Sequence, residues 1–303
     1  MRAPAISACR TFRQTRVLIV GCGDVGLRVA TMLRGHCRVR ALTSSPDKVV
    51  ALRAQGLVPL LGNLDQPASL ARLAGLAPYV LHLAPPPGHG AHDPRTQALL
   101  TALARRGGMQ ALAYGSTTGV YGNAHGAEFD ETRAVAPATD RARRRVAAER
   151  WVRQWGRSMA LRQGTRAGVL RIPGIYAPDR EGGDPRERVR RGAPLLRPED
   201  DVFTNHIHAD DLARACALYL WRGKPQRTLH VCDDTRLKMG DYFDLVADRA
   251  GLPRCPRLSR AEAAAQLSPM QMSFMGESRL LRNTRLKTEL RLSLHHPLAP
   301  GEF

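Results

Sequence analysis

A glycine-rich turn near the start of the chain constrains the fold more than any other sequence feature. The apolar run 16–20 leads directly into Gly21, Gly23 and Gly26, and residues 25–33 then follow a helical pattern. In a strand–turn–helix unit with this spacing, the first glycine permits a sharp turn and the second lets the backbone approach a pyrophosphate. The third lets the helix pack closely on the strand. A purely structural turn is the alternative, and we favour a βαβ unit that binds a dinucleotide.

Asp24 and Val25 lie inside the same turn and open the helix. The first amides of a helix lack an intrahelical acceptor and carry a partial positive charge, so they bind phosphate readily. We therefore expect both residues to contribute to cofactor binding.

Apolar runs alternate with helix-like stretches as far as residue 172, which is typical of a parallel sheet covered by helices on both faces. This alternation predicts an α/β fold, a Rossmann doubly wound parallel sheet, over residues 16–172. The predicted strands are 16–20, 37–42, 57–61, 79–83, 109–115 and 167–172, and the helices between them include 25–33, 46–54 and 96–106.

Residues 173–303 are predicted to form a smaller C-terminal substrate lobe, because the pattern loosens there into proline, glycine and charge, with no clear strand until residue 201. Residues 201–220 read as an extended segment followed by a helix, and 227–234 as a buried strand. The lobe is therefore expected to be partly interleaved with the sheet. Residues 1–15 form an N-terminal extension in this division.

Hydroxyl side chains stand where the second predicted strand ends. An NAD-specific protein usually places Asp or Glu there, against the ribose 2′-hydroxyl, whereas this chain has Thr43, Ser44 and Ser45. Hydroxyls can hydrogen-bond a 2′-phosphate without repelling it, so the cofactor is predicted to be NADP or NAD, with NADP favoured. Arg40 or Lys48 could supply the counter-charge. The alternative is that the hydroxyls only cap the following helix.

Composition argues against several other classes of protein. The net charge of +19 attracts polyanions, but only four of the 46 basic residues are lysines and the arginines are spread over the whole length. Nucleic acid is therefore an unlikely partner. Six cysteines without a Cys-x-x-Cys pair fit neither a zinc site nor a disulfide framework. No apolar run approaches the roughly 20 residues of a membrane span, and no secretory signal is recognisable. We expect a cytoplasmic protein.

Five motifs follow one another along the chain, namely YGSTTGVYG (114–122), FDET (129–132), LRIPGIYAPDR (170–180), NHIHADDLARA (205–215) and LHVCDD (229–234). In this order and spacing they resemble the extended short-chain dehydrogenase/reductase superfamily, in particular its atypical branch, the NAD-dependent epimerase/dehydratase proteins. The resemblance covers roughly residues 16–234 and implies a Rossmann protein with a C-terminal substrate lobe. The better understood members oxidise, epimerise or dehydrate nucleotide sugars.

The resemblance implies roles for individual residues. Thr117, four residues before Tyr121, falls where the family places the Ser or Thr that hydrogen-bonds the substrate hydroxyl or carbonyl. Asn63 and Leu64 occupy the place of the pair that touches adenine. Ala84 and Pro85 match the loop beside the nicotinamide ribose, although a rigid proline-rich exit from a strand explains them equally well.

The family's Tyr-x-x-x-Lys motif is altered, because Arg141 and Arg145 stand at its two positions. In the family that tyrosine is the general acid/base, and its pKa is lowered by the lysine. An arginine stays protonated and cannot replace it. Arg145 can still hydrogen-bond the nicotinamide ribose, and Arg141 could clamp an anionic substrate through its planar fork. A solvated basic helix is the alternative interpretation.

Three other residues are candidates for moving a proton, namely Tyr121, Asp140 and Tyr176. Tyr121 is retained with the arginines and Thr117 as a candidate catalytic residue.

No metal site is expected. His206 and His208, followed by Asp210 and Asp211, have side chains that suit a metal, but in the family pattern these aspartates begin a helix and cap it. The tail from residue 258 is predicted to form two helical stretches separated by Ser268-Pro269, with a methionine-rich middle over the substrate pocket.

The leading hypothesis is an enzyme that transfers a hydride at a hydroxyl or carbonyl of a small polar substrate, with a nucleotide sugar as one candidate. The rival is an NAD(P)-binding sensor or scaffold without redox chemistry, which the missing tyrosine favours. A third hypothesis is polyanion binding by the basic surface. The sequence leaves open whether the protein forms a homodimer.

Overall fold

The computed structural model describes residues 14–298, and its centre is a seven-stranded sheet in which all strands run parallel. The strand order is β11-β7-β5-β4-β1-β2-β3. This order, with crossovers on both sides of β1, confirms the predicted Rossmann fold. The strands are β1 (Thr15–Val20), β2 (Cys37–Thr43), β3 (Val58–Leu61), β4 (Tyr79–His82), β5 (Ala111–Thr117), β7 (Arg166–Ile172) and β11 (Thr228–His230).

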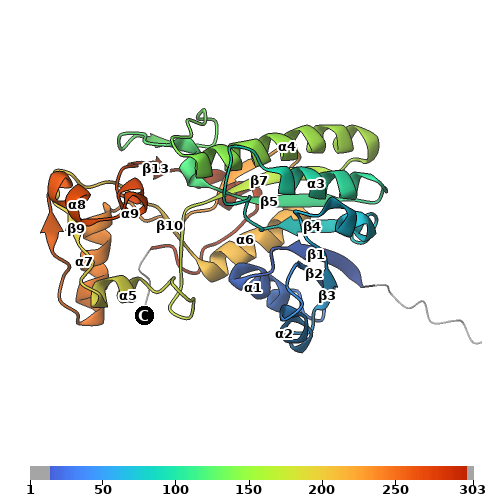
Figure 1. Cartoon of the computed structure of the whole chain (residues 1–303), viewed down its shortest axis with the longest axis horizontal. Coiled ribbons are helices and arrows are strands. Elements are labelled where there is room, and N and C mark those ends of the chain that lie inside the picture. Colours follow the sequence, from blue (N-terminus) through green and yellow to red (C-terminus); the bar gives the residue numbers. More distant parts are fainter. Residues whose placement is uncertain (1–13, 299–303) are drawn as a thin grey trace, which may run out of the picture.

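Both faces of the sheet are buried, as the apolar run of β1 illustrates. Val17 and Ile19 face one hydrophobic cluster, whereas Leu18 and Val20 face a second cluster on the opposite side. The first is closed by α1 (Asp24–Met32) and α6 (Ala209–Arg222), and the second by α3 (Pro94–Ala104) and α4 (Asp140–Gln163). Figure 1 shows these two helical layers on either side of the sheet. The period-two alternation of a strand therefore places the sheet between two cores. The remaining elements beside the sheet are α2 (Lys48–Ala54), α10 (Thr284–Glu289) and the 3₁₀ helices η1 (Pro67–Leu73) and η2 (Thr118–Tyr121).

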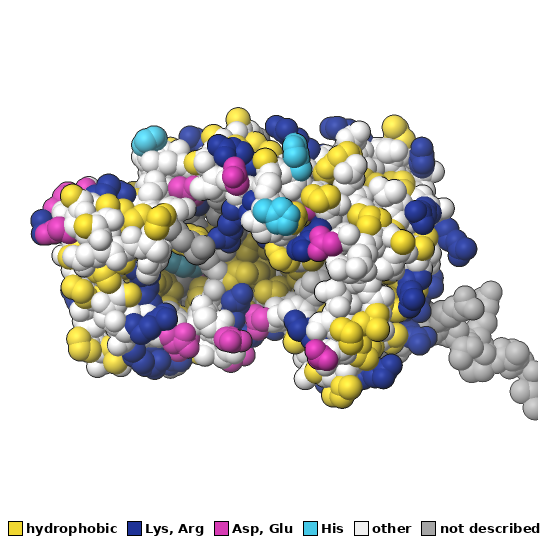
Figure 2. All heavy atoms as spheres, viewed as in Figure 1, with side chains coloured by type: hydrophobic (Ala, Val, Ile, Leu, Met, Phe, Trp, Pro, Cys, Tyr) yellow, Lys and Arg dark blue, Asp and Glu magenta, His cyan; other side chains and the backbone are white. Residues whose placement is uncertain are grey.

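A smaller body lies beside the sheet and carries its own apolar cluster, in which Val189 of α5 packs with Tyr242 and Val246 of α7. Figure 1 shows α5, α7, α8 and α9 gathered there, and Figure 2 shows the molecule hollowed between this body and the sheet. The chain returns to the sheet through α6 and β11, so the two parts are interleaved as expected; the division at residue 172 itself stays a prediction. The elements of this region are α5 (Pro185–Arg190), α7 (Met239–Ala250), α8 (Arg260–Gln266), α9 (Pro269–Phe274) and three two-stranded parallel pairs, β8 (Gly174–Tyr176) with β10 (His206–His208), β9 (Leu195–Leu196) with β12 (Arg257–Leu258), and β6 (Glu128–Phe129) with β13 (Leu280–Leu281).

Several predicted boundaries are corrected. The strand expected at 109–115 runs from Ala111 to Thr117, because the amide of Gln110 still bonds to the loop carbonyl of Pro78. The helix expected at 96–106 begins two residues earlier, where Asp93 caps it by accepting the Thr96 amide at 3.1 Å. The region before residue 201 was expected to lack strands, yet it contains β8 and β9.

Most of the predicted N-terminal extension, residues 1–13, lies outside the described residues. The five cysteines between residues 14 and 298 are free thiols, as expected. Over the same range no helix has the length and apolar character needed to cross a bilayer.

Candidate functional site

The three glycines of the turn after β1 have different surroundings. Gly21 has φ +86° and would place a Cβ 2.3 Å from the amide nitrogen of Ala84, so only glycine fits there. Gly26 lies against β1, where a Cβ would be 3.2 Å from Cγ2 of Ile19. A Cβ at Gly23 would meet nothing within 4 Å. Gly21 and Gly26 therefore serve the fold, whereas Gly23 borders open space at the start of α1, where the phosphates of a dinucleotide would fit.

One cavity, of about 360 Å³, lies on one side of this turn. Its wall includes Ser44, Asn63 and Leu64, which the sequence predicted for the adenosine half, whereas Ser45 is not on it. Ala84 and Pro85, predicted beside the nicotinamide ribose, also line this cavity and not the one described next, so the structure places that loop differently from the prediction. We call this first cavity the adenosine cavity.

Lys48 is also on the wall of the adenosine cavity, and Arg40 is not. The Arg40 guanidinium instead donates to the carbonyl of Leu76 at 2.6 Å. Of the two expected counter-charges, only Lys48 thus faces this space. The alternative that the hydroxyls cap α2 finds no support, since the Thr43 hydroxyl accepts the amide of Ser45 and no side chain caps that helix.

A second cavity, of about 270 Å³, lies on the other side of the turn and shares Gly21 and Gly23 with the first. We call it the nicotinamide cavity. Its wall brings together the other predicted site residues except Tyr121, and they come from the turn, the end of β5 and the first turns of α4: Asp24, Val25, Gly26, Thr117, Arg141 and Arg145. A dinucleotide that straddles the glycine turn would reach from one cavity to the other.

A third cavity, of about 540 Å³, lies between the sheet and the smaller body, and we call it the substrate cavity. Residues of the smaller body on its wall include Phe203, Asn205, Phe274 and Arg279. It shares five wall residues with the nicotinamide cavity: Thr117, Arg141, Pro173, Ile175 and Arg180. We call these five the junction.

Thr117 and Arg145 are held by backbone contacts around the end of β5. Arg145 donates to the carbonyl of Gly115 at 2.8 Å and to the hydroxyl of Tyr114 at 3.2 Å. The Thr117 hydroxyl accepts the amide of Gly119 at 3.3 Å, which leaves its proton free to be donated. Both side chains are therefore positioned before any ligand binds.

Arg141 lies near the start of α4 and is exposed. Its guanidinium carbon lies 5.8 Å from the ring centroid of Phe274 on α9. It forms no hydrogen bond or ion pair with the other residues of 14–298. Arg141 is thus a cation on the wall of two cavities without a charge partner from the described chain.

Tyr121 lies in a buried network away from all three cavities. Its hydroxyl is 2.5 Å from Nε2 of His230 and accepts a hydrogen bond from Arg171 at 2.5 Å. Burial raises the pKa of Tyr121 to about 12. Because only 1% of this residue is exposed, we give it no part in proton transfer.

The same network continues to a buried ion pair. Both oxygens of Glu149 accept from Arg171, at 3.0 and 2.7 Å, and one also accepts from Ser116 at 2.7 Å. Burial by itself would raise the pKa of Glu149, but the bonds and charge of Arg171 outweigh it and hold that pKa below its usual range. The other two candidates for a proton lie elsewhere: Asp140 pairs with Arg143, and Tyr176 packs in the smaller body.

A chain of ion pairs ties the glycine turn to the smaller body. Asp24 lies 3.2 Å from both Arg28 and Arg180, and Arg28 also bonds to Asp179 and Asp210 at 2.6 Å each. Sequence reasoning missed Arg180 and Arg28. The motif LRIPGIYAPDR could have indicated Arg180, because its last two residues, Asp179 and Arg180, both belong to this series of ion pairs.

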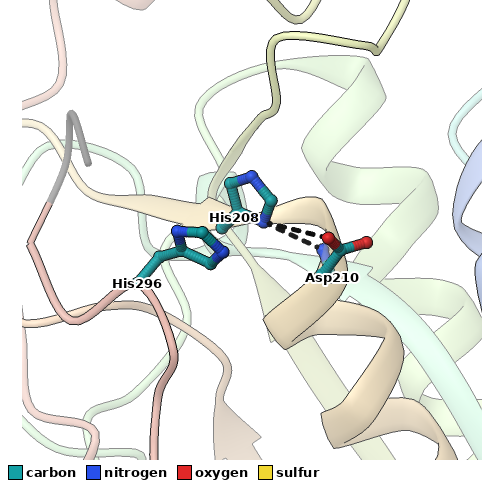
Figure 3. A group of neighbouring side chains, drawn as sticks. All are labelled: His208, Asp210 and His296. Carbon is teal, nitrogen blue, oxygen red and sulfur yellow. Dashed lines mark hydrogen bonds and ion pairs between the residues drawn. The ribbon is translucent and has the colours of Figure 1, made fainter. Parts of the chain in front are cut away.

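His208, Asp210 and His296 lie close together (Figure 3). The rings of the two histidines stack with centroids 3.7 Å apart and planes 22° apart. Nδ1 of His208 accepts the Asp210 amide at 3.2 Å, and the Asp210 carboxylate already binds Arg28. These contacts cap α6 and hold the tail against it, and the absence of a metal at this cluster stays a prediction.

The capping of α6 corrects the expectation for its aspartates, because the cap is His208. Asp211 is buried and instead accepts the amides of His295 and His296, at 3.0 and 2.8 Å.

The methionine-rich segment also differs from expectation. Its two helical stretches, α8 and α9, are present on either side of Ser268-Pro269. However, Met272 and Met275 pack with Ala263 in a separate apolar cluster. Ser273 and Phe274 are the residues of α9 that face the substrate cavity.

Comparison with known proteins agrees with this geometry. The sequence model of the NAD dependent epimerase/dehydratase family matches residues 17–232. The chain belongs to this family. The glycine turn and the strand order agree with this family, and its description as NAD dependent agrees with the expected cofactor. A preference for NADP over NAD stays a prediction.

A comparison with curated proteins gives no match. Among solved structures, the chain is similar to a functionally unknown conserved protein from Silicibacter pomeroyi DSS, with 30% identity over 94% of this chain and 95% of that chain and a TM-score of 0.77.

Two enzymes share the fold at 19% identity. One is UDP-glucose 4-epimerase from Thermotoga maritima with UDP-glucose, which covers 93% of this chain and 94% of its own, with a TM-score of 0.74. The other is DesIV from Streptomyces venezuelae, a dTDP-glucose 4,6-dehydratase with NAD bound, which covers 93% and 92%, with a TM-score of 0.73.

Proposed function

We propose that this protein is an NAD(P)-dependent enzyme that transfers a hydride at a hydroxyl-bearing or carbonyl carbon of a small polar substrate. The observation that carries the proposal is the series of three cavities. The adenosine and nicotinamide cavities meet at the glycine turn, and the nicotinamide and substrate cavities meet at Thr117. A dinucleotide and a second molecule could therefore meet end to end at the junction. Nucleotide sugars, which the two enzymes of similar fold bind or process, are the first substrates to test.

When bound, the nicotinamide would accept or supply the hydride, and three residues of the chain would direct the reaction. The Thr117 hydroxyl would donate a hydrogen bond to the reacting oxygen and so orient the substrate. Arg145 would bind the nicotinamide ribose, and Arg141 would supply positive charge beside the reacting centre.

Proton transfer would proceed without a tyrosine. Oxidation of an alcohol releases a hydride to the oxidised cofactor and a proton, and the proton would pass to water in the open substrate cavity. The junction contains no carboxylate, imidazole, phenol or amine that could act as a general base. The rate of oxidation should therefore rise with pH without the plateau that a general base produces.

We further propose that NADP is preferred over NAD. Ser44 and Lys48 border the adenosine cavity, and neither side chain repels a 2′-phosphate. Ser44→Asp should lower the affinity for NADPH more than that for NADH, and an equal effect on both would contradict the preference.

The test combines binding and turnover. NADPH and NADH are titrated by fluorescence, and cofactor reduction or oxidation is followed with a panel of nucleotide sugars, hydroxy acids and sugar phosphates. Thr117→Val should lower kcat by roughly 100-fold, as loss of an oxyanion donor does. Thr101→Val, at an exposed position of α3, is the control and should have no effect. Failure to bind either nucleotide would refute the proposal.

A second function is favoured by the altered motif. No side chain of the junction is a proton acceptor at neutral pH, which suits a nucleotide-binding sensor without redox chemistry. Tight NADPH binding with no turnover across the whole panel would support the sensor, whereas turnover with any member would exclude it.

A further inference from the structure

The junction contains two charged side chains, and both are arginines, Arg141 and Arg180. We propose that the junction is an oxyanion site, where Arg141 holds a carboxylate or phosphate of the substrate beside the carbon that reacts. This inference rests on the proposed function for the identity of the reacting carbon, but the oxyanion site can be tested without turnover.

The charge of the substrate cavity supports an anionic ligand. Its wall contains three arginines, Arg141, Arg180 and Arg279, and one carboxylate, Glu277. Glu277 is already engaged, because Arg279 donates to it at 2.7 Å. Even with that pair neutralised, two positive charges remain on the wall. A low-dielectric cavity with such an excess attracts anions.

Arg180 and Arg141 differ in how that charge is compensated. Arg180 lies 3.2 Å from the Asp24 carboxylate, so part of its charge is balanced within the chain. Arg141 has no ion pair or hydrogen bond to any described residue. A guanidinium presents planar pairs of N–H groups that match a carboxylate or phosphate bidentately, and here the whole set is available.

Phe274 orients this guanidinium without using its donors. The ring centroid lies 5.8 Å from the guanidinium carbon, within the range of a cation–π contact. A ring offers no conventional acceptor atom, so this contact commits none of the N–H groups to a hydrogen bond with the chain. Arg141 can therefore be steadied by α9 and still bind an oxyanion from the cavity.

The position of Thr117 specifies the ligand further. Thr117 and Arg141 line the same two cavities, so a ligand at the junction can present its reacting oxygen to Thr117 and an oxyanion to Arg141. Short hydroxy or oxo acids satisfy this, as do small phosphorylated alcohols. In both groups an oxyanion lies within a few bonds of a hydroxyl or carbonyl.

The experiment measures binding to the full chain saturated with NADPH, by isothermal titration calorimetry. The probes are oxamate, which has a carboxylate beside a carbonyl, its neutral analogue oxamide, and inorganic phosphate. Oxamate or phosphate should bind and oxamide should not. Binding of oxamate alone identifies a carboxylate site, and binding of phosphate alone identifies a phosphate site.

Three variants assign the binding to Arg141. Arg141→Gln should weaken the anion by roughly 10- to 100-fold, as expected for loss of a charge-assisted pair. Arg141→Lys should retain part of the affinity. The matched control is Arg150→Gln, an exposed arginine on the same helix that lines none of the three cavities. It should bind like the wild type.

The proposal would be overturned if neither anion binds the NADPH complex, if oxamide binds as well as oxamate, or if Arg141→Gln and Arg150→Gln bind alike. Melting temperatures of the variants show that each one is folded. If only the proposed hydride transfer is wrong, the result is different: anion binding still depends on Arg141, but no substrate is turned over.

Discussion

Arg171 and Arg141 show two ways in which this fold places a guanidinium near the carboxyl end of β5. Arg171 is 3% exposed and is bonded to Glu149 and Tyr121. Arg141 is exposed on the wall of two cavities and has no charge partner among the described residues. A buried cation is tolerated only with a partner, whereas a cation beside open space can be completed by a ligand.

Two neighbouring residues of β5 connect these regions. Ser116 donates to Glu149 in the buried network and also borders the nicotinamide cavity, whereas Thr117 borders both the nicotinamide and the substrate cavities. One strand end therefore supplies a hydroxyl bound within the network and a candidate catalytic hydroxyl at the junction.

The largest expected effect comes from breaking the buried network. Glu149→Gln would leave Arg171 buried without its carboxylate and should destabilise the protein by about 3–5 kcal/mol. Urea unfolding measures this loss. Replacing both residues, with Glu149→Leu and Arg171→Leu together, should cost less than the single change, because no fully buried charge is left without a partner. Arg153, which also donates to Glu149 at 2.9 Å, is partly exposed and can be solvated. If Glu149→Gln lowers the free energy of unfolding by less than about 1 kcal/mol, then Arg171 does not depend on its carboxylate partner, and it does not differ from Arg141 in the way described.

The next effect depends on pH and concerns His230. Its Nδ1 donates to the carbonyl of Arg282 and its Nε2 accepts from Tyr121, so the network requires a neutral ring. Burial lowers the pKa of His230 from 6.5 to about 4, so between these values the unfolded chain binds a proton that the folded chain does not. The wild type should lose on the order of 1.4 kcal/mol per pH unit from this residue as the pH falls through that window.

His230→Gln removes this linkage. The difference in unfolding free energy between the wild type and the variant should therefore shrink as the pH falls from about 6.5 to about 4, and stay constant above and below that range. A difference that is independent of pH would show that the ring is not held neutral by the network.

The smallest expected change in stability distinguishes Gly21 from Gly23, two glycines of the same turn. Gly21→Ala forces a Cβ against Ala84 at positive φ and should destabilise the protein by roughly 1–3 kcal/mol. Gly23→Ala meets no atom within 4 Å and should leave the unfolding midpoint unchanged, yet weaken NADPH binding because the methyl enters the phosphate space. Equal stability losses for the two variants would contradict the assignment of Gly23 to the ligand.

Local patterns predicted much of the fold and the cofactor half of the site. The alternating apolar runs gave the parallel sheet, and the glycine spacing gave the turn whose neighbours now line two cavities. Thr117 was found because it lies in a short motif at a strand end. Each of these features depends on residues that are close in the sequence.

The rest depends on contacts between distant residues. Tyr121 looked like a proton donor because the sequence does not reveal that its hydroxyl meets His230, 109 positions away. Arg171 was the available signal for a buried partner, because it lies next to the last residue of β7, after the apolar run 167–170. Arg279 reaches the substrate cavity from a tail whose packing no local period specifies.

A crystal structure of the protein with NADP⁺ tests the account most directly. We predict that the pyrophosphate lies at Gly21 and Gly23 and that the 2′-phosphate of the adenosine ribose lies near Ser44 and Lys48. The nicotinamide should lie at the junction, beside Thr117. A nucleotide bound elsewhere, or bound with its nicotinamide in the adenosine cavity, would contradict the central claim.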